Sequence, residues 1–303
     1  MDKVDSVAII GAGPAGIATA IQLKRHGVEP ILLEKGEIGG LLRNANLVEN
    51  YLGFPDGISG SELVKLFKKQ LENAGVGVRF EEVINLDYRD GQFLLETNLC
   101  TFTCPIVVVA SGTKPRSLSY PDTLQEDIRD RIFYEIHSFQ VSNERIAVIG
   151  AGDAAFDYAL HFSSNNEVTI LNRSSKVKCL PLLWERAARS ENISYLEETE
   201  VKRIEPCDGL ILTCSTPSGE RKIFSNYLII AIGRDPCLGF LRKNIRNDIK
   251  GLRQAGKLYF VGNVSEGIYR QTAISTGDGV RVAMEICIKN GTPGLGRSYE
   301  DYS

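Results

Sequence analysis

The chain has 303 residues, of which 43% are hydrophobic and 24% charged, and this composition is ordinary for a globular protein of two domains. A net charge of −3 argues against nucleic acid as the main partner. The sequence contains no secretion signal and no run long enough to span a membrane, and its seven scattered cysteines favour reduced thiols, so we expect a cytoplasmic protein.

The first predicted elements are a strand, a glycine-rich turn and a helix. An apolar run at residues 7–10 is followed by Gly11, Gly13 and Gly16 in the spacing G-x-G-x-x-G. These glycines permit a tight turn, a close approach to a pyrophosphate and close helix packing. The next strand ends at Glu34, where a carboxylate can hold a ribose hydroxyl. The pattern predicts a dinucleotide site with a helix N-terminus facing the phosphates.

The rest of the first half alternates loops and regular elements. Gly, Pro and Asn mark loops at residues 36–42 and 48–55, and a helix with one apolar face is predicted over 61–74. Residues 76–103 are predicted to form short antiparallel strands. A continuous apolar strand at 106–110 is typical of a central parallel strand, and its end is a predicted exit from the domain.

A second unit repeats this pattern with one change. A predicted strand at 146–149 precedes Gly150, Gly152 and Ala155 in the spacing G-x-G-x-x-A. The next strand ends at residues 172–176, where cations and hydroxyls replace the acid of the first unit. An arginine there attracts a 2′-phosphate that an acid would repel, so the pattern favours NADP over NAD. A solvated basic loop is the alternative.

The last third completes a weak internal repeat. Strands are predicted over 192–232 with a turn at 217–220, and the last of them ends at Gly233. A further strand near 258–261 leads to a long helix over 270–289.

The two glycine motifs, the strand ends at 110–112 and 231–233, and the terminal Gly262–Asn263 with Tyr269–Ile274 form an ordered set. Together they resemble the thioredoxin reductase-like FAD/NAD(P)-dependent pyridine nucleotide oxidoreductases over nearly the whole chain. The resemblance implies an α/β fold of two Rossmann-like, three-layer ββα nucleotide-binding domains, the second inserted in the first. It implies an FAD domain of residues 1–116 and 250–303, an NAD(P) domain of residues 117–249, and a homodimer.

The resemblance also implies the binding residues for FAD and for NADPH, with NADH as the alternative donor and with no metal site. The implied FAD residues are Gly11, Gly13, Pro14, Ala15, Gly16, Glu34, Lys35, Gly39, Gly40, Leu41, Asn50, Ala110, Ser111, Gly112, Gly262, Asn263, Arg270, Gln271, Thr272 and Ala273. The implied NADP residues are Gly150, Gly152, Asp153, Ala154, Ala155, Asn172, Arg173, Ser174, Lys176, Ile232 and Gly233. Asn263 stands where the family has Asp, and its amide can still bond a ribityl hydroxyl.

The cofactors would carry the chemistry, with hydride passing from the nicotinamide to flavin N5 and no obligatory acid–base residue. Thioredoxin reductases carry a C-x-x-C before the second glycine motif, but residues 133–139 contain no cysteine. Cys100 and Cys104, spaced C-x-x-x-C, are predicted to be packing residues. His137 is a candidate neighbour of the flavin, and a surface histidine in a linker is the alternative.

The missing dithiol makes protein disulfides poor acceptors. The closest functional type is then the thioredoxin reductase-like ferredoxin (flavodoxin)–NADP reductase, with ferredoxin or flavodoxin as partner. A diaphorase that reduces quinone or dioxygen and a slow flavin-bound redox sensor are the alternatives. An acidic carrier needs a basic patch, which could also be a solvated helix face; the candidate residues are Lys65, Lys68 and Lys69, or Arg242, Lys243, Arg246 and Lys250. Tyr299 or Tyr302 is a candidate cover for the flavin, and a frayed tail is the alternative.

Overall fold

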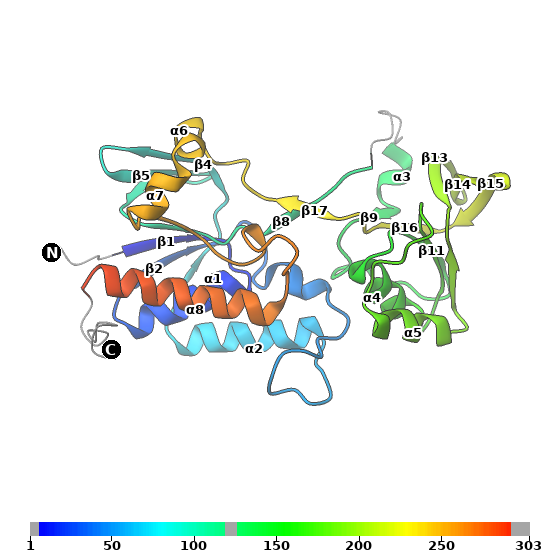
Figure 1. Ribbon diagram of the computed structural model, residues 1–303, viewed down its shortest axis with the longest axis horizontal. Helices are drawn as coiled ribbons and strands as arrows, with labels where there is room; N and C mark the ends of the chain where they lie inside the picture. The colour runs from blue at the N-terminus through cyan, green and yellow to red at the C-terminus, as the bar shows by residue number, and fades with distance from the viewer. Residues whose placement is uncertain (1–5, 119–125, 292–303) are drawn as a thin grey trace. The chain divides into compact units, whose positions relative to one another are not determined.

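The computed structural model of the chain describes residues 6–118 and 126–291 (Figure 1). Packing divides them into two compact units. The first unit comprises residues 6–43, 49–113 and 236–291, and the second comprises 44–48, 114–118 and 126–235. Within these ranges, no helix combines the length and apolar character needed to cross a membrane.

The first unit is built on a five-stranded parallel sheet in the order β18-β7-β1-β2-β3. The strands are β1 (Ser6–Ile10), β2 (Glu29–Leu33), β3 (Val78–Arg79), β7 (Val107–Val109) and β18 (Leu258–Phe260). Val7 to Ile9 and the whole of β7 are completely buried, as expected for central strands covered on both faces.

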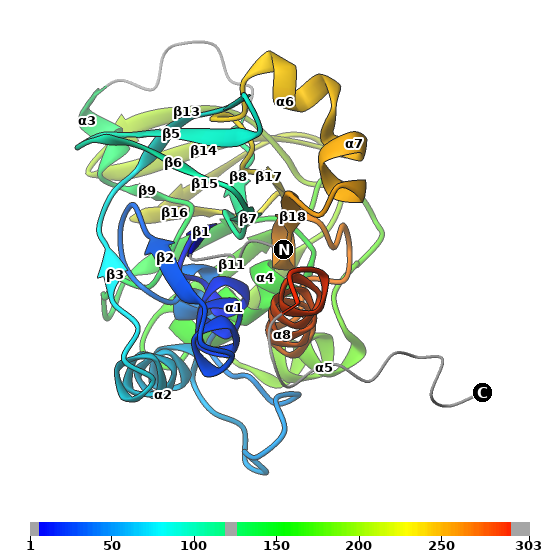
Figure 2. The same ribbon diagram turned by 90° about the vertical axis from the view of Figure 1, so that its left-hand side faces the viewer.

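Helices cover one face of this sheet and an antiparallel layer covers the other (Figure 2). The helices are α1 (Pro14–Arg25), α2 (Gly60–Asn73) and α8 (Thr272–Lys289). The opposite layer contains β4 (Val83–Arg89), β5 (Gln92–Thr97), β6 (Thr101–Cys104), α6 (Lys243–Asn247) and α7 (Ile249–Gln254). Phe93, Leu95 and Ile245 from this layer are completely buried against the sheet.

The second unit repeats the three layers around a parallel sheet in the order β12-β11-β10-β16-β9. The strands are β9 (Ile132–Phe133), β10 (Arg145–Ile149), β11 (Glu167–Leu171), β12 (Ile193–Leu196) and β16 (Tyr227–Ile230). Helices α4 (Asp153–Phe162) and α5 (Pro181–Arg189) cover one face, and the antiparallel strands β13 (Glu200–Cys207), β14 (Gly209–Thr216) and β15 (Gly219–Ser225) cover the other. A short helix, α3 (Glu126–Arg129), precedes β9. The predicted fold class of two Rossmann-like ββα units is therefore confirmed.

Two predictions need correction. The predicted domain boundaries are wrong in two directions. Residues 236–249, predicted in the second domain, belong to the first unit because Leu241 and Ile245 are buried in its core and Leu86 N–H donates to Phe240 O at 2.8 Å. Residues 44–48 and 114–116, predicted in the first domain, belong to the second unit. The connection instead crosses at β17 (Arg234–Pro236), which pairs with β8 (Thr113–Pro115). The predicted antiparallel run over 76–103 starts with a parallel strand, since β3 continues the main sheet beside β2.

Candidate functional site

The first glycine loop requires glycine at two positions for steric reasons. Gly11 has φ +108°, and an ideal Cβ on it would lie 2.5 Å from Ala110 O. A Cβ on Gly16 would lie 1.9 Å from Gly11 O. Gly11 N–H donates to Leu33 O at 2.8 Å, which ties the turn to β2. These contacts leave no room for side chains where β1 turns into α1.

Gly13 is different because its side-chain direction is open. Nothing lies within 4 Å of an ideal Cβ on Gly13, which is the N-cap of α1. No side chain caps this helix, and Pro14 occupies its first position. The N–H groups of the first turn, around Ala15, therefore meet an open space with the positive end of the helix dipole behind them, and this is the geometry of an anion site.

Gly39 and Gly40 lie against the same turn. Gly39 N–H donates to Ala12 O at 2.8 Å, and an ideal Cβ on Gly40 would lie 3.4 Å from Gly13 Cα. Leu41 follows in the short 3₁₀ helix η1 (Gly40–Asn44).

Glu34 connects the end of β2 to this loop. Its carboxylate accepts hydrogen bonds from Ala12 N–H at 2.8 Å and from Gly36 N–H at 3.0 Å. These bonds hold the side chain of Glu34 beside the glycine turn. Its neighbour Lys35 is exposed and lies 4.0 Å from Glu82.

Residues from the C-terminal part of the chain pack against the first glycine turn and the start of α1. Gly262 N–H donates to Asp278 Oδ2 at 2.8 Å, and an ideal Cβ on Gly262 would lie 2.7 Å from Ala15 Cβ. Gly279 brings α8 equally close, since its Cβ would lie 2.3 Å from Ala15 O. Asp278 is buried and also pairs with Arg281. Residues from both ends of the chain thus meet at the N-terminus of α1.

Polar side chains join the loops around the start of α8. Asn50 Nδ2 donates to Gln271 Oε1 at 3.0 Å, and Ser275 Oγ donates to Asn263 Oδ1 at 3.4 Å. Gln271 is the N-cap of α8 and its side chain does not cap the helix, so the first N–H groups, beginning at Thr272, have no partner within the helix. Arg270 is half-buried next to this end, and Ala273 is exposed.

Residues 110–112, which follow β7, form hydrogen bonds with Cys237, the residue after β17. Ser111 Oγ donates to Cys237 O at 2.7 Å, and Cys237 N–H donates to Gly112 O at 3.0 Å. The backbone of this strand end borders the glycine turn, since an ideal Cβ on Gly11 would lie 2.5 Å from Ala110 O and 3.3 Å from Ser111 Cα.

The second unit builds an equivalent turn at the end of β10. Gly150 has φ +142°, and its ideal Cβ would lie 2.4 Å from Ala231 O. Gly152 is the uncapped N-cap of α4, with nothing within 4 Å of its ideal Cβ. The methyl group of Ala155 fits without exposure, 3.4 Å from the ideal Cβ of Gly150. The second turn therefore tolerates alanine at the third position of its motif, where the first turn requires glycine.

Other predicted residues of the second unit have structural contacts. Asp153 Oδ1 accepts from Leu180 N–H at 2.8 Å, just before α5, while Ala154 is exposed. Gly233 O accepts from Arg116 N–H at 3.0 Å, and Ile232 packs against the core.

The basic loop after β11 has a buried amide at its base. Asn172 is 5% exposed and bonds to the loop itself, while Arg173 and Lys176 are exposed and Ser174 is half-buried. No acid in the described parts of the chain pairs with Arg173.

Residues 135–137, where a dithiol would be expected, contact Asn44. Asn44 is 5% exposed; it donates to Glu135 and accepts from Ile136 N–H at 2.8 Å and His137 N–H at 3.0 Å. The His137 ring is exposed, with Nδ1 3.3 Å from Asn44 Oδ1. Burial, and secondarily the charge of Glu135, raises the pKa of Tyr158 nearby.

All seven cysteines are free, and the two in C-x-x-x-C spacing have different surroundings. Cys104 is completely buried, and burial raises its pKa. Cys100 was predicted to be a packing residue, but it is exposed because it lies in the turn before β6, with Sγ 3.4 Å from Glu81 Oε2. The environment of Cys104 therefore disfavours the thiolate that a redox-active cysteine needs.

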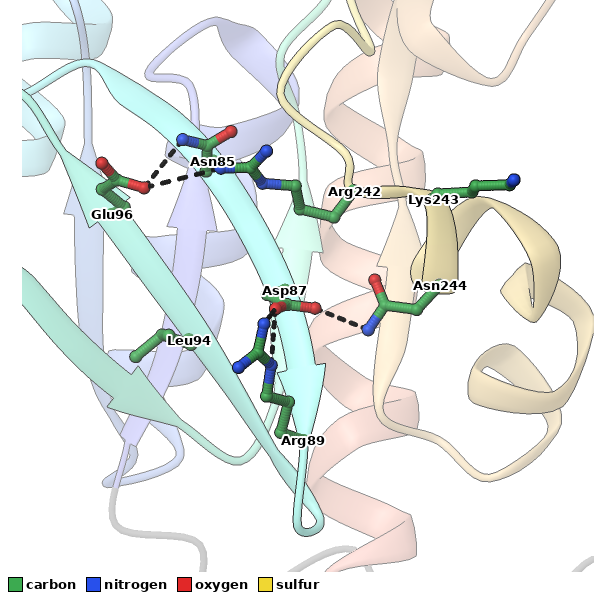
Figure 3. Close-up of a pocket in the computed structure, with 8 residues that line it drawn as sticks. All are labelled: Asn85, Asp87, Arg89, Leu94, Glu96, Arg242, Lys243 and Asn244. Carbon is green, nitrogen blue, oxygen red and sulfur yellow. Dashed lines mark hydrogen bonds and ion pairs between the residues drawn. The ribbon is translucent and has the colours of Figure 1, made fainter.

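A groove of about 600 Å³ lies between β4, β5 and α6 (Figure 3). Its charges are mixed, since Asp87 pairs with Arg89 at 2.6 Å and Glu96 lies 4.0 Å from Arg242. Burial acts to raise the pKa of Asp87, but hydrogen bonds led by Asn244 lower it overall. The residues that line the groove therefore form polar contacts between α6 and the β4–β5 hairpin.

The structure adds residues that the sequence did not identify. Asp278, Gly279 and Asn44 reach the candidate sites only through tertiary contacts, which no local sequence pattern predicts. A glycine inside a helical pattern was the one available signal for Gly279. Tyr299 and Tyr302 lie outside the described residues.

Comparisons with known proteins give consistent relatives. The family described as pyridine nucleotide-disulphide oxidoreductase matches residues 5–275. A thioredoxin reductase of Chlamydia pneumoniae is 26% identical over 299 residues, covering 91% of this chain and 96% of the relative. One from Mycolicibacterium smegmatis is 27% identical over 296 residues, covering 93% and 95%. The crystal structure of Lactococcus lactis thioredoxin reductase (FR conformation) has a TM-score of 0.84 at 27% identity, covering 95% of this chain and 99% of that one.

Proposed function

The chain belongs to the pyridine nucleotide-disulphide oxidoreductase family, and we propose that it is a member that passes electrons from NADPH to an external acceptor without a dithiol of its own. An NAD(P)H-dependent flavin oxidoreductase follows from the family, and the thioredoxin reductase-like members use FAD and NADPH. The acceptor and the roles of single residues are the proposal.

The first unit fits FAD. The open direction at Gly13, the uncapped start of α1 and the fixed carboxylate of Glu34 match a pyrophosphate and a ribose. Asp278 would position Gly262, and the Asn50–Gln271 pair would hold the loops that border the ring system. FAD, when bound, supplies an acceptor for hydride and can release the electrons singly or as a pair.

The second unit would bind NADPH. The uncapped start of α4 at Gly152 would receive the pyrophosphate, and Arg173 with Lys176 would attract the 2′-phosphate.

In the first unit, the uncapped start of α8 at Thr272 would direct the positive end of the helix dipole toward the negative charge of reduced flavin.

The observation that carries the acceptor proposal is the segment at residues 133–139. It holds no cysteine, and its polar groups bond to Asn44 instead. Ferredoxin or flavodoxin is the proposed acceptor because a flavin can split a hydride into single electrons. The basic segment 242–257 contains six cations and one acid and would attract an acidic carrier.

Electron counting tests the absence of a dithiol. Anaerobic dithionite titration should reduce the protein with two electrons per flavin, whereas an additional redox-active disulfide would raise this to about four. A Cys100→Ser/Cys104→Ser variant is the matched control and should give the same count. An uptake near four electrons that falls in this variant would overturn the proposal.

Kinetics test the acceptor. Stopped-flow mixing with NADPH should bleach the flavin faster than about 1 s⁻¹, the lower end of ordinary turnover; slower bleaching would support a redox sensor. Ferredoxin or flavodoxin should then be reduced faster than quinone or dioxygen. If neither carrier is reduced faster than quinone and dioxygen, the acceptor is a small molecule.

We also propose that the chain forms a homodimer, and the molar mass from light scattering tests this.

A further inference from the structure

The buried side-chain amide of Asn172 holds the basic loop that follows β11. Asn172 Nδ2 donates to Lys176 O at 3.0 Å, and Asn172 Oδ1 accepts from Ser174 N–H at 3.1 Å and Ser174 Oγ at 3.3 Å. These bonds span both ends of the segment that carries Arg173. A side chain buried to this degree costs free energy unless its polar atoms are paired, so the loop conformation and the amide depend on each other.

A second side chain fixes this amide from the neighbouring strand. Asn172 Nδ2 also donates to the hydroxyl oxygen of Tyr195 on β12, at 2.8 Å. The Tyr195 ring packs edge-on against Trp184 at 5.0 Å, and its centroid lies 6.0 Å from that of the completely buried Phe156. The hydroxyl is therefore presented by a ring whose position is set by aromatic packing.

The equivalent residue of the first unit does something different. Glu34 turns back and bonds Ala12 N–H in its own glycine loop, at 2.8 Å. Asn172 instead bonds forward into the loop that follows it. The strand end of the second unit is thus built to shape a loop, and the exposed cations of that loop are Arg173 and Lys176.

We propose that Asn172 and Tyr195 are positioning residues that hold the Arg173–Lys176 loop in the shape that reads the 2′-phosphate of NADPH. This inference rests on the proposed NADPH site. Selectivity for the 2′-phosphate then depends on the contact between Asn172 and Tyr195 as well as on the exposed cations. A loop that is already held in shape loses less conformational entropy when its cations bind the phosphate.

The test compares two ligands that differ only in the 2′-phosphate. Calorimetry on the FAD-loaded protein would measure dissociation constants for adenosine 2′,5′-bisphosphate and adenosine 5′-monophosphate. The wild type should bind the bisphosphate at least about 10-fold more tightly, and Arg173→Ala should abolish most of this ratio. Tyr195→Phe keeps the ring and removes one hydrogen-bond acceptor, so it should reduce the ratio by about 3- to 10-fold while leaving the monophosphate affinity unchanged.

Tyr227→Phe is the matched control. Tyr227 is a partly buried tyrosine of the same unit whose ring packs against Phe139 at 5.0 Å, away from the loop contacts. It should retain the wild-type ratio. Trp184 is the only tryptophan, so its fluorescence gives an independent titration of both ligands.

The outcomes separate the two proposals. If the wild type does not distinguish the ligands and Arg173→Ala changes nothing, the NADPH assignment fails. If the wild type does distinguish them but Tyr195→Phe behaves like Tyr227→Phe, the positioning role is overturned. An equal loss of affinity for both ligands in Tyr195→Phe also overturns it, since that would reflect general loosening of the site.

Discussion

Gly279 sets how closely α8 approaches α1, and its substitution gives a quantitative prediction. An ideal Cβ there would lie 2.3 Å from Ala15 O and 2.9 Å from Thr19 Oγ1. Real Cβ contacts essentially never fall under 3.0 Å, so Gly279→Ala requires a displacement of at least 0.7 Å (3.0 minus 2.3). Overpacking of this kind costs about 1–3 kcal/mol.

Gly277→Ala is the control on the same helix. Gly277 is exposed, and nothing lies within 4 Å of its ideal Cβ. Both variants gain up to about 1 kcal/mol of helix propensity, which cancels when they are compared. We expect Gly279→Ala to be about 1–3 kcal/mol less stable than Gly277→Ala. It should also release FAD at a lower urea concentration, because α8 packs against the start of α1 beside the first glycine turn.

Urea titration of the FAD-loaded proteins measures this difference. Flavin fluorescence reports cofactor release, and circular dichroism reports unfolding. Equal midpoints for the two variants would refute the close packing of α8 on α1 as a determinant of the site.

Three further predictions follow from other contacts. Gly16→Ala would place a Cβ 1.9 Å from the carbonyl oxygen of the first glycine in its motif, so the protein should purify without visible flavin absorbance; normal flavin content would contradict this geometry. Thiol labelling at about pH 8 followed by mass spectrometry should modify the exposed Cys100 and Cys207 but not Cys214, whose pKa burial raises to about 11; labelling of Cys214 before unfolding would argue against its burial. Asp87 has a lowered pKa in the folded protein, so it stabilises the fold above its unfolded pKa of about 4 and loses this effect as pH falls through the folded value. Asp87→Asn should therefore lower the urea midpoint at neutral pH and approach the wild type in strong acid, and a constant difference at all pH values would exclude this linkage.

Local patterns were sufficient to predict most of the fold. The apolar run before Gly11 and the glycine spacing depend on a few consecutive residues, and the structure forms the strand, turn and helix that they indicate. The helix predicted over 61–74 is α2, with Ser59 as its N-cap, and the long C-terminal helix begins at Thr272.

Contacts between distant segments could not be predicted in this way. Ile245 belongs to the first unit because its side chain is buried against strands more than 100 positions earlier. The bond from Gly262 to Asp278 and the contacts of Asn44 with residues 135–137 also depend on tertiary packing. A parallel edge strand as short as β3 carries no periodic signal of its own.

The meeting of α1 and α8 has a consequence for how the protein is made. Ala15 and Gly279 touch although they are 264 positions apart (279 minus 15). At ordinary synthesis rates, the ribosome needs roughly 10 to 50 s to add the residues between them. The segment 126–235 emerges complete before then and contains nearly all of its own core, whereas the N-terminal strand and helix must wait. Flavin loading is therefore expected only after the last helix leaves the ribosome, which makes the N-terminal region the part most dependent on chaperones in the newborn chain.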